Sequence, residues 1–151
     1  MKVIVGYPPL TLRHKGVALL SQNRQYQIFH APTFIYPMVP AYAASNLKAH
    51  GYDVAWIDGI AEEQSFEDYL IRLQEEKPDV LLVESKAPVI RHHWEIAKVL
   101  KEKFPDLILV WVGDHVTWNP METLDNSPID YIVTGGDYDL DDYGGRWFVV
   151  S

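Results

Sequence analysis

Short apolar runs that alternate with helix-like segments constrain the fold of this chain more than any other feature. Val80–Val83 and Leu107–Val112 are almost continuously hydrophobic, as is typical of strands buried on both faces of a sheet. Between them, Ile90–Phe104 carries Trp94, Ile96, Ala97, Leu100 and Phe104 as the residues expected to pack. Strands that alternate with helices form a parallel sheet covered on both faces. We expect strands at 2–6, 53–57, 80–83, 107–112 and 131–134.

Right-handed crossovers limit the order of five such strands. They favour a Rossmann-like, flavodoxin-like, doubly wound α/β sheet of order 2-1-3-4-5. We expect helices at about 39–50, from 66 onward with Ser65 as N-cap and Asp68 at its third position, at 90–104 and at 120–124. Residues 10–37 are too long for an ordinary loop after the first strand and suggest a cover or an interface. One domain over residues 1–139 follows, with an acidic, glycine-containing tail at 140–151 that is either an edge strand or the mark of truncation.

Composition excludes several function classes. The 151 residues suit one domain, and none of them is cysteine, so disulfides, thiolate catalysis and cysteine-bound zinc or iron–sulfur clusters are absent from this chain. A net charge of −8 argues against binding to nucleic acid or an anionic membrane. Apolar stretches are all shorter than the roughly 20 residues of a membrane span. We therefore expect a cytoplasmic protein without nucleic-acid or membrane partners.

Small and polar residues follow each predicted strand. In an open parallel sheet, ligands bind outside the carboxyl ends of the strands. Glycines there let a flat, bulky ligand approach the backbone, and we favour this interpretation of Gly135 and Gly136 over the alternative, a simple turn before a surface tail. The candidate binding residues are Tyr7, Pro8, Pro9, Glu84, Ser85, Lys86, Gly113, Asp114, His115, Val116, Thr117, Gly135, Gly136 and Asp137.

Familiar catalytic and phosphate-binding motifs are missing. The sequence has neither G-x-G-x-x-G nor a P-loop, and prolines after the first strand cannot form an amide nest. Receiver-domain carboxylates and Ser-His-Asp arrangements are also absent, so we expect no independent active site. His115 is either a ligand- or metal-binding group or a loop histidine satisfied by backbone. Of His92 and His93, at least one is expected to face solvent.

Six short segments follow one another in a characteristic order: Tyr7-Pro8-Pro9, 37–44, 56–63, Lys77-Pro78-Asp79, 113–117 and 126–139. Together they resemble the amino-terminal cobalamin-binding domain of B12-dependent radical SAM enzymes. The similarity covers about residues 2–139.

This resemblance implies a corrin ring at the carboxyl ends of the strands. By position, the ring would meet Tyr7–Pro9, Gly113–Thr117 and Gly135–Asp137, with Glu84–Pro88 near the nucleotide tail or the ring edge. The pattern D-x-H-x-x-G is absent, so the resemblance implies base-off cobalamin without a histidine ligand from that motif. In full enzymes of this family, a following radical SAM domain commonly transfers methyl groups, with an iron–sulfur cluster and S-adenosylmethionine.

Two hypotheses follow. The first is a cobalamin-binding module, not catalytic on its own, that presents cobalt to a radical SAM catalytic domain or partner protein. The second is a stand-alone interaction or sensory domain with the same fold and no corrinoid, in which exposed aromatics such as Tyr26, Phe29 and Tyr36 form the interface.

Overall fold

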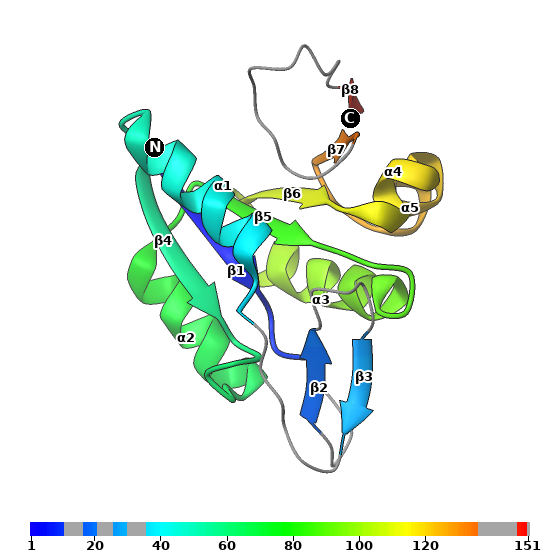
Figure 1. Ribbon diagram of the computed structural model, residues 1–151, viewed down its shortest axis with the longest axis horizontal. Helices are drawn as coiled ribbons and strands as arrows, with labels where there is room; N and C mark the ends of the chain where they lie inside the picture. The colour runs from blue at the N-terminus through cyan, green and yellow to red at the C-terminus, as the bar shows by residue number, and fades with distance from the viewer. Residues whose placement is uncertain (11–16, 21–25, 30–35, 136–147, 151) are drawn as a thin grey trace.

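The computed structural model describes residues 1–10, 17–20, 26–29, 36–135 and 148–150; in 17–20, 26–29 and 148–150, it describes only the backbone. Five parallel strands form the centre of the sheet, in the order β4-β1-β5-β6-β7 (Figure 1). This is the order 2-1-3-4-5 that the sequence predicts. The strands are β1 (Lys2–Tyr7), β4 (Asp53–Asp58), β5 (Val80–Glu84), β6 (Ile108–Val112) and β7 (Tyr131–Thr134).

Helices lie on both faces of the sheet, as predicted. Helix α1 (Met38–Ala49) packs on one face, where Ala44 meets Val3 and Val5 of β1. Helices α2 (Phe66–Glu76) and α3 (Ile90–Lys103) cover the other face. Ser65 is the N-cap of α2, and its hydroxyl accepts a hydrogen bond from the Asp68 amide at 3.1 Å, as the capping pattern predicts.

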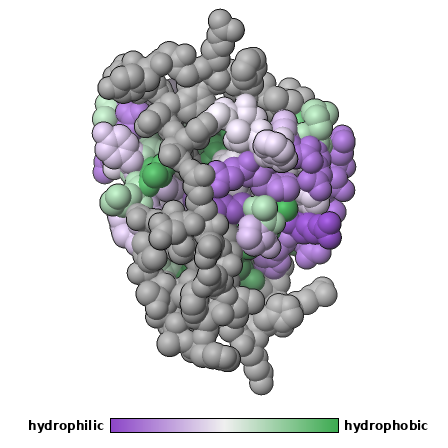
Figure 2. All heavy atoms as spheres, turned by 45° about the vertical axis from the view of Figure 1, so that its right-hand side comes forward, coloured by the Kyte–Doolittle hydropathy of each residue, from purple (hydrophilic) through white to green (hydrophobic). Residues whose placement is uncertain are grey.

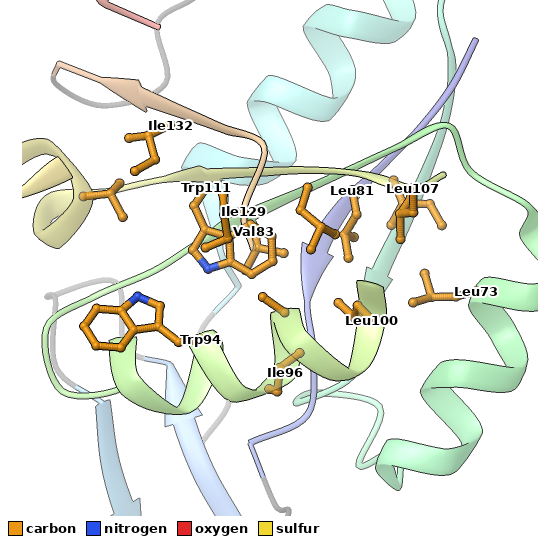
Figure 3. Packing of buried hydrophobic residues seen from close by; sticks show 14 of the residues in the cluster. Leu73, Leu81, Val83, Trp94, Ile96, Leu100, Leu107, Trp111, Ile129 and Ile132 are labelled. Atoms are coloured by element: carbon orange, nitrogen blue, oxygen red, sulfur yellow. The ribbon is translucent and has the colours of Figure 1, made fainter. Parts of the chain in front are cut away.

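The main core lies between the sheet and the α2–α3 layer. Alternate residues of β5 and β6 face this layer, because successive side chains of a strand point to opposite faces. Figure 3 shows Leu81 and Trp111 of the sheet facing Leu100 of α3, and all three are completely buried. Of the five residues in 90–104 that were expected to pack, four are buried and Phe104 is half-buried; the four are Trp94, Ile96, Ala97 and Leu100. The α2–α3 layer thus supports the sheet from one side.

Two segments differ from the sequence prediction, and a third agrees with one of its alternatives. The connection at 10–37 contains an antiparallel hairpin, β2 (Val17–Leu20) with β3 (Tyr26–Phe29), where we expected only loop. The segment after β6 is a short helix, α4 (Asp114–Trp118), followed by α5 (Pro120–Asn126). A run of five residues is too short to show helical periodicity, so sequence alone did not reveal α4. Strand β8 (Phe148–Val150) pairs antiparallel with β7, which resolves that part of the tail as an edge strand.

On the face drawn in Figure 2, the described residues carry mostly hydrophilic side chains, and the apolar ones among them are visible as small separate patches. Among the described helices, none combines the length and the apolar character that crossing a bilayer requires.

Candidate functional site

The ends of β1 and β5 are joined by a buried polar network. The Tyr7 hydroxyl donates to Oε2 of Glu84 at 2.5 Å, and Nζ of Lys86 lies 3.2 Å from Oε1 of the same carboxylate. The side chains of Glu84 and Lys86 are only 13% and 7% exposed. Charges removed from water are costly unless they are paired and hydrogen-bonded. This network therefore keeps the middle of the carboxyl edge free of an unpaired buried charge.

Ser85 is completely buried beside a histidine that sequence reasoning did not select. Its hydroxyl lies 2.8 Å from Nδ1 of His93 on α3, and both residues are 0% exposed. We expected at least one of His92 and His93 to face solvent, yet His92 is half-buried and His93 is fully buried. A signal was present, because His93 follows Ile90 by three positions and precedes Ala97 by four, within the apolar stripe of the helix.

Gly113 serves the packing of the protein itself. Its φ of +114° lies in a region that favours glycine, and a Cβ atom there would lie 2.5 Å from the Ser85 carbonyl oxygen. We expected this glycine to leave space for a ligand. A Cβ there would meet the backbone of the β5–α3 connection, so the packing of the protein already requires a glycine at this position.

His115 lies on α4 rather than in a loop. Its Nε2 is 3.1 Å from Oε2 of Glu122 on α5, so a carboxylate, not the backbone, is its partner. In the part of the chain that the structure describes, no three histidine, aspartate or glutamate side chains gather closely enough to hold a metal ion. The contact between His115 and Glu122 joins α4 to α5.

The ends of β6 and β7 form the exposed part of the candidate site. The Gly135 amide donates to Oγ1 of Thr117 at 3.3 Å, which brings the two strand exits together. Asp114, Thr117 and Gly135 are all exposed, and the φ of Gly135 is +104°. Polar groups and open backbone are therefore accessible to a ligand here.

The candidate residues thus divide into two groups. Those that follow β1 and β5 are largely buried, whereas exposed groups follow β6 and β7. Gly136 and Asp137 lie outside the described residues. The buried members are Tyr7, Pro8, Pro9, Ser85, Lys86 and Val116.

Asp58 adds a polar group at the end of β4 that sequence reasoning did not select. Its carboxylate accepts hydrogen bonds from the amides of Ile60 and Ala61 at 3.2 and 3.0 Å. Burial raises the pKa of Asp58, while these two amides oppose the shift. Asp58 therefore stabilises the turn after β4 through these two hydrogen bonds. It lies at the carboxyl edge because it is the last residue of a parallel strand.

A cavity of about 670 Å³ lies at the opposite edge of the sheet, between the ends of α2 and α3. Its lining includes Leu70, Lys77, Phe104 and Asp106, and none of the candidate residues. Its size falls within the range of small-molecule sites. We nevertheless place the candidate site at the carboxyl edge, because the topology of open parallel sheets puts ligands there.

Comparison with known protein families gives a match that covers most of the chain. Residues 28–140 match the model of the B12 binding domain. The matched range contains the ends of β4, β5, β6 and β7.

Three curated relatives align over about two thirds of the chain. An uncharacterized methyltransferase of Pyrococcus horikoshii is 31% identical over 100 residues, which are 66% of this chain and 22% of the relative. Anaerobic magnesium-protoporphyrin IX monomethyl ester cyclases of Rubrivivax gelatinosus and Cereibacter sphaeroides are 33% and 34% identical over 101 residues, with 18% and 16% of their lengths covered. The aligned region is thus about a fifth of each relative.

Proposed function

Because this chain belongs to the family of B12-binding domains, we propose that it holds cobalamin at the carboxyl edge of its parallel sheet. The observation that carries the proposal is the family match over residues 28–140, which includes the exposed ends of β6 and β7. A domain that holds a cofactor needs no catalytic residues of its own. This agrees with the absence of catalytic motifs from the sequence.

The accessible groups at this edge fit the periphery of a corrinoid. A corrin ring carries amide side chains, which need hydrogen-bonding partners, and a broad face, which needs open backbone. Asp114, Thr117 and Gly135 offer a carboxylate, a hydroxyl and an exposed glycine next to one another. These three residues would hold the polar periphery, since a few well-placed polar groups orient a ligand in such sites.

The buried network beneath this edge would act as a neutral support. Glu84 is matched by Lys86 and by the Tyr7 hydroxyl, so the support adds no unpaired charge below the ligand. The sequence lacks D-x-H-x-x-G, so we propose base-off cobalamin without a histidine ligand from that motif. When bound, cobalamin supplies a cobalt centre that can carry a methyl group.

A catalytic domain or partner protein would use the bound cofactor. The chain spans about a fifth of the length of the curated relatives it matches, and one of these is named as a methyltransferase. The resemblance to B12-dependent radical SAM enzymes suggests a radical SAM domain as the partner. Because the chain has no cysteine, cysteine ligands for an iron–sulfur cluster would come from that partner.

Retention of hydroxocobalamin tests the proposal. The purified protein is mixed with the cofactor and desalted, and its visible spectrum is recorded. Thr117→Trp places a bulky indole on the exposed edge and is expected to abolish retention. Gln74→Trp is the matched control, because Gln74 is exposed and lines the cavity at the opposite edge. Loss of retention in both variants, or in neither, would argue against the proposed location.

A specific observation favours a second candidate function, a protein-interaction or sensory domain without corrinoid. Trp118 is 90% exposed, and Tyr42, Tyr36 and Met38 are 74%, 68% and 61% exposed. Met38 and Tyr42 lie four residues apart on α1 and so share one face of that helix, and contiguous exposed apolar side chains mark interaction surfaces. The side chains of Tyr26 and Phe29 lie outside the described residues. A folded wild-type protein that retains no corrin absorbance would favour this second candidate.

A further inference from the structure

His93 is a polar side chain inside the core, at the junction of three elements. The side chain projects from α3 and is 0% exposed. Its Nδ1 lies 2.8 Å from Oγ of Ser85, which follows β5. Its ring meets the ring of Trp111 on β6 edge-on, with centroids 6.4 Å apart. A buried polar group is costly unless a hydrogen bond compensates it, so the contact with Ser85 is the one that offsets this cost.

The direction of this hydrogen bond follows from the other ring nitrogen. Burial lowers the pKa of His93 to about 3, so the imidazole is neutral and carries one proton. Nε2 is buried and has no hydrogen-bond partner among the described residues. An orphaned N–H donor is rarer in protein interiors than an unsatisfied acceptor. We therefore assign the proton to Nδ1, as the donor to Oγ of Ser85.

The backbone of Ser85 also contacts the end of β6. Its amide donates to the Val112 carbonyl at 2.8 Å, and its carbonyl oxygen lies 2.5 Å from where a Cβ of Gly113 would be. Gly113 is the N-cap residue of α4, which carries Asp114 and Thr117. A continuous series of contacts thus connects the buried imidazole to the exposed groups of the carboxyl edge.

We propose that His93 is a positioning residue for the corrinoid site. By holding the Ser85 hydroxyl, it fixes the β5–α3 connection against Gly113 and so sets the position of α4 at the carboxyl edge. This inference rests on the proposed function, because the groups that it positions are those that would hold cobalamin. His93 itself touches no ligand.

A comparison of four variants tests the inference through the dissociation constant for hydroxocobalamin. His93→Leu and Ser85→Ala each remove one side of the hydrogen bond and are expected to weaken binding by up to about tenfold, the worth of one net hydrogen bond. The double variant is expected to bind no more weakly than either single variant, because both act through one contact. His93→Asn, whose side-chain amide can donate from near the position of Nδ1, is expected to restore binding.

The control is His50→Leu. It makes the same chemical change and also breaks a hydrogen bond, that of Nδ1 with the Asn46 carbonyl oxygen at 2.9 Å, but at the far end of α1. The dissociation constant of His50→Leu for hydroxocobalamin is expected to equal that of the wild type. If folded His93→Leu and Ser85→Ala also bind as the wild type does, the inference is wrong and the proposed function stands.

Other outcomes separate the two proposals. If the wild type binds no cobalamin, the proposed function fails and the inference fails with it. If only His93→Leu weakens binding, His93 does not act through Ser85. In nitrogen-15 spectra of the wild-type protein, the imidazole is expected as the Nδ1–H tautomer, and an Nε2–H tautomer would overturn the assigned donor.

Discussion

At the scale of single residues, the carboxyl edge is shaped by contacts within the protein. Ser85 bonds to His93, Glu84 pairs with Lys86, and Gly113 makes room for backbone. These contacts leave the exposed groups on α4 and after β7 as the ones that a ligand can reach.

The neutrality of His93 predicts how stability depends on pH. The unfolded chain binds a proton at this histidine below its ordinary pKa of 6.5, whereas burial lowers the pKa in the folded protein to about 3. The free energy of unfolding therefore falls as the pH is lowered from 6.5 to 3. His93→Asn lacks this titration, so between pH 7 and about pH 4.5 it is expected to lose less stability than the wild type in urea denaturation. Equal losses would contradict the buried, neutral imidazole.

Two glycines with positive φ predict different costs of substitution. Gly113→Ala is expected to destabilise the protein more than Gly51→Ala. At Gly51, φ is +87° and a Cβ meets nothing within 4 Å, so alanine costs only the backbone strain of about 1–2 kcal/mol. At Gly113, overlap with the Ser85 carbonyl adds about 1–3 kcal/mol. Chemical denaturation measures the loss of unfolding free energy in both variants. Equal losses would mean that the backbone at Ser85 shifts without cost to accommodate a Cβ at Gly113.

Which residues could be predicted from sequence depends on the range of the interaction. Ser65 as N-cap was predictable because its partner, Asp68, is three residues away. The pairing of Ser85 with His93 depends on how α3 docks on β5, which local patterns do not encode. The role of Gly113 likewise depends on a neighbouring strand exit.

At the scale of elements, the two faces of the sheet are buried unequally. The face toward α2 and α3 holds the large core, whereas the cluster under α1 contains only three buried residues, Val3, Val5 and Ala44, among the described ones. The nearly continuous apolar sequences of β5 and β6 predict burial on both faces of the sheet, because successive side chains of a strand point to opposite faces. How well each face is covered depends on which helices pack on it. The sequence after β7 has no clear helical pattern, so it predicts no further helix.

Adjacent leucines of β5 provide a direct test of this difference. Leu81 is completely buried against the α2–α3 layer, and Leu82 is half-buried on the α1 side. Leu81→Ala is expected to lower the free energy of unfolding by about 3–5 kcal/mol, as in other fully buried leucines. Leu82→Ala is expected to cost clearly less, since it loses less buried area. Equal losses in urea denaturation would show that both faces are equally well packed.

At the scale of the whole molecule, the two edges of the sheet differ in character. The carboxyl edge combines the exits of the parallel strands with the described candidate site residues. The opposite edge has the cavity between α2 and α3 but none of the candidate site residues. The fold and the family were predictable from the order of short motifs, whereas the division of the site into buried and exposed parts was visible only in three dimensions.

The most direct measurement is a map of amide chemical shifts during titration with hydroxocobalamin. We expect the largest changes at Asp114, Thr117 and Gly135, with little change at Lys77 and Asp106 on the opposite edge. Largest changes around the α2–α3 cavity, or none at all in the folded protein, would contradict cobalamin binding at the carboxyl edge.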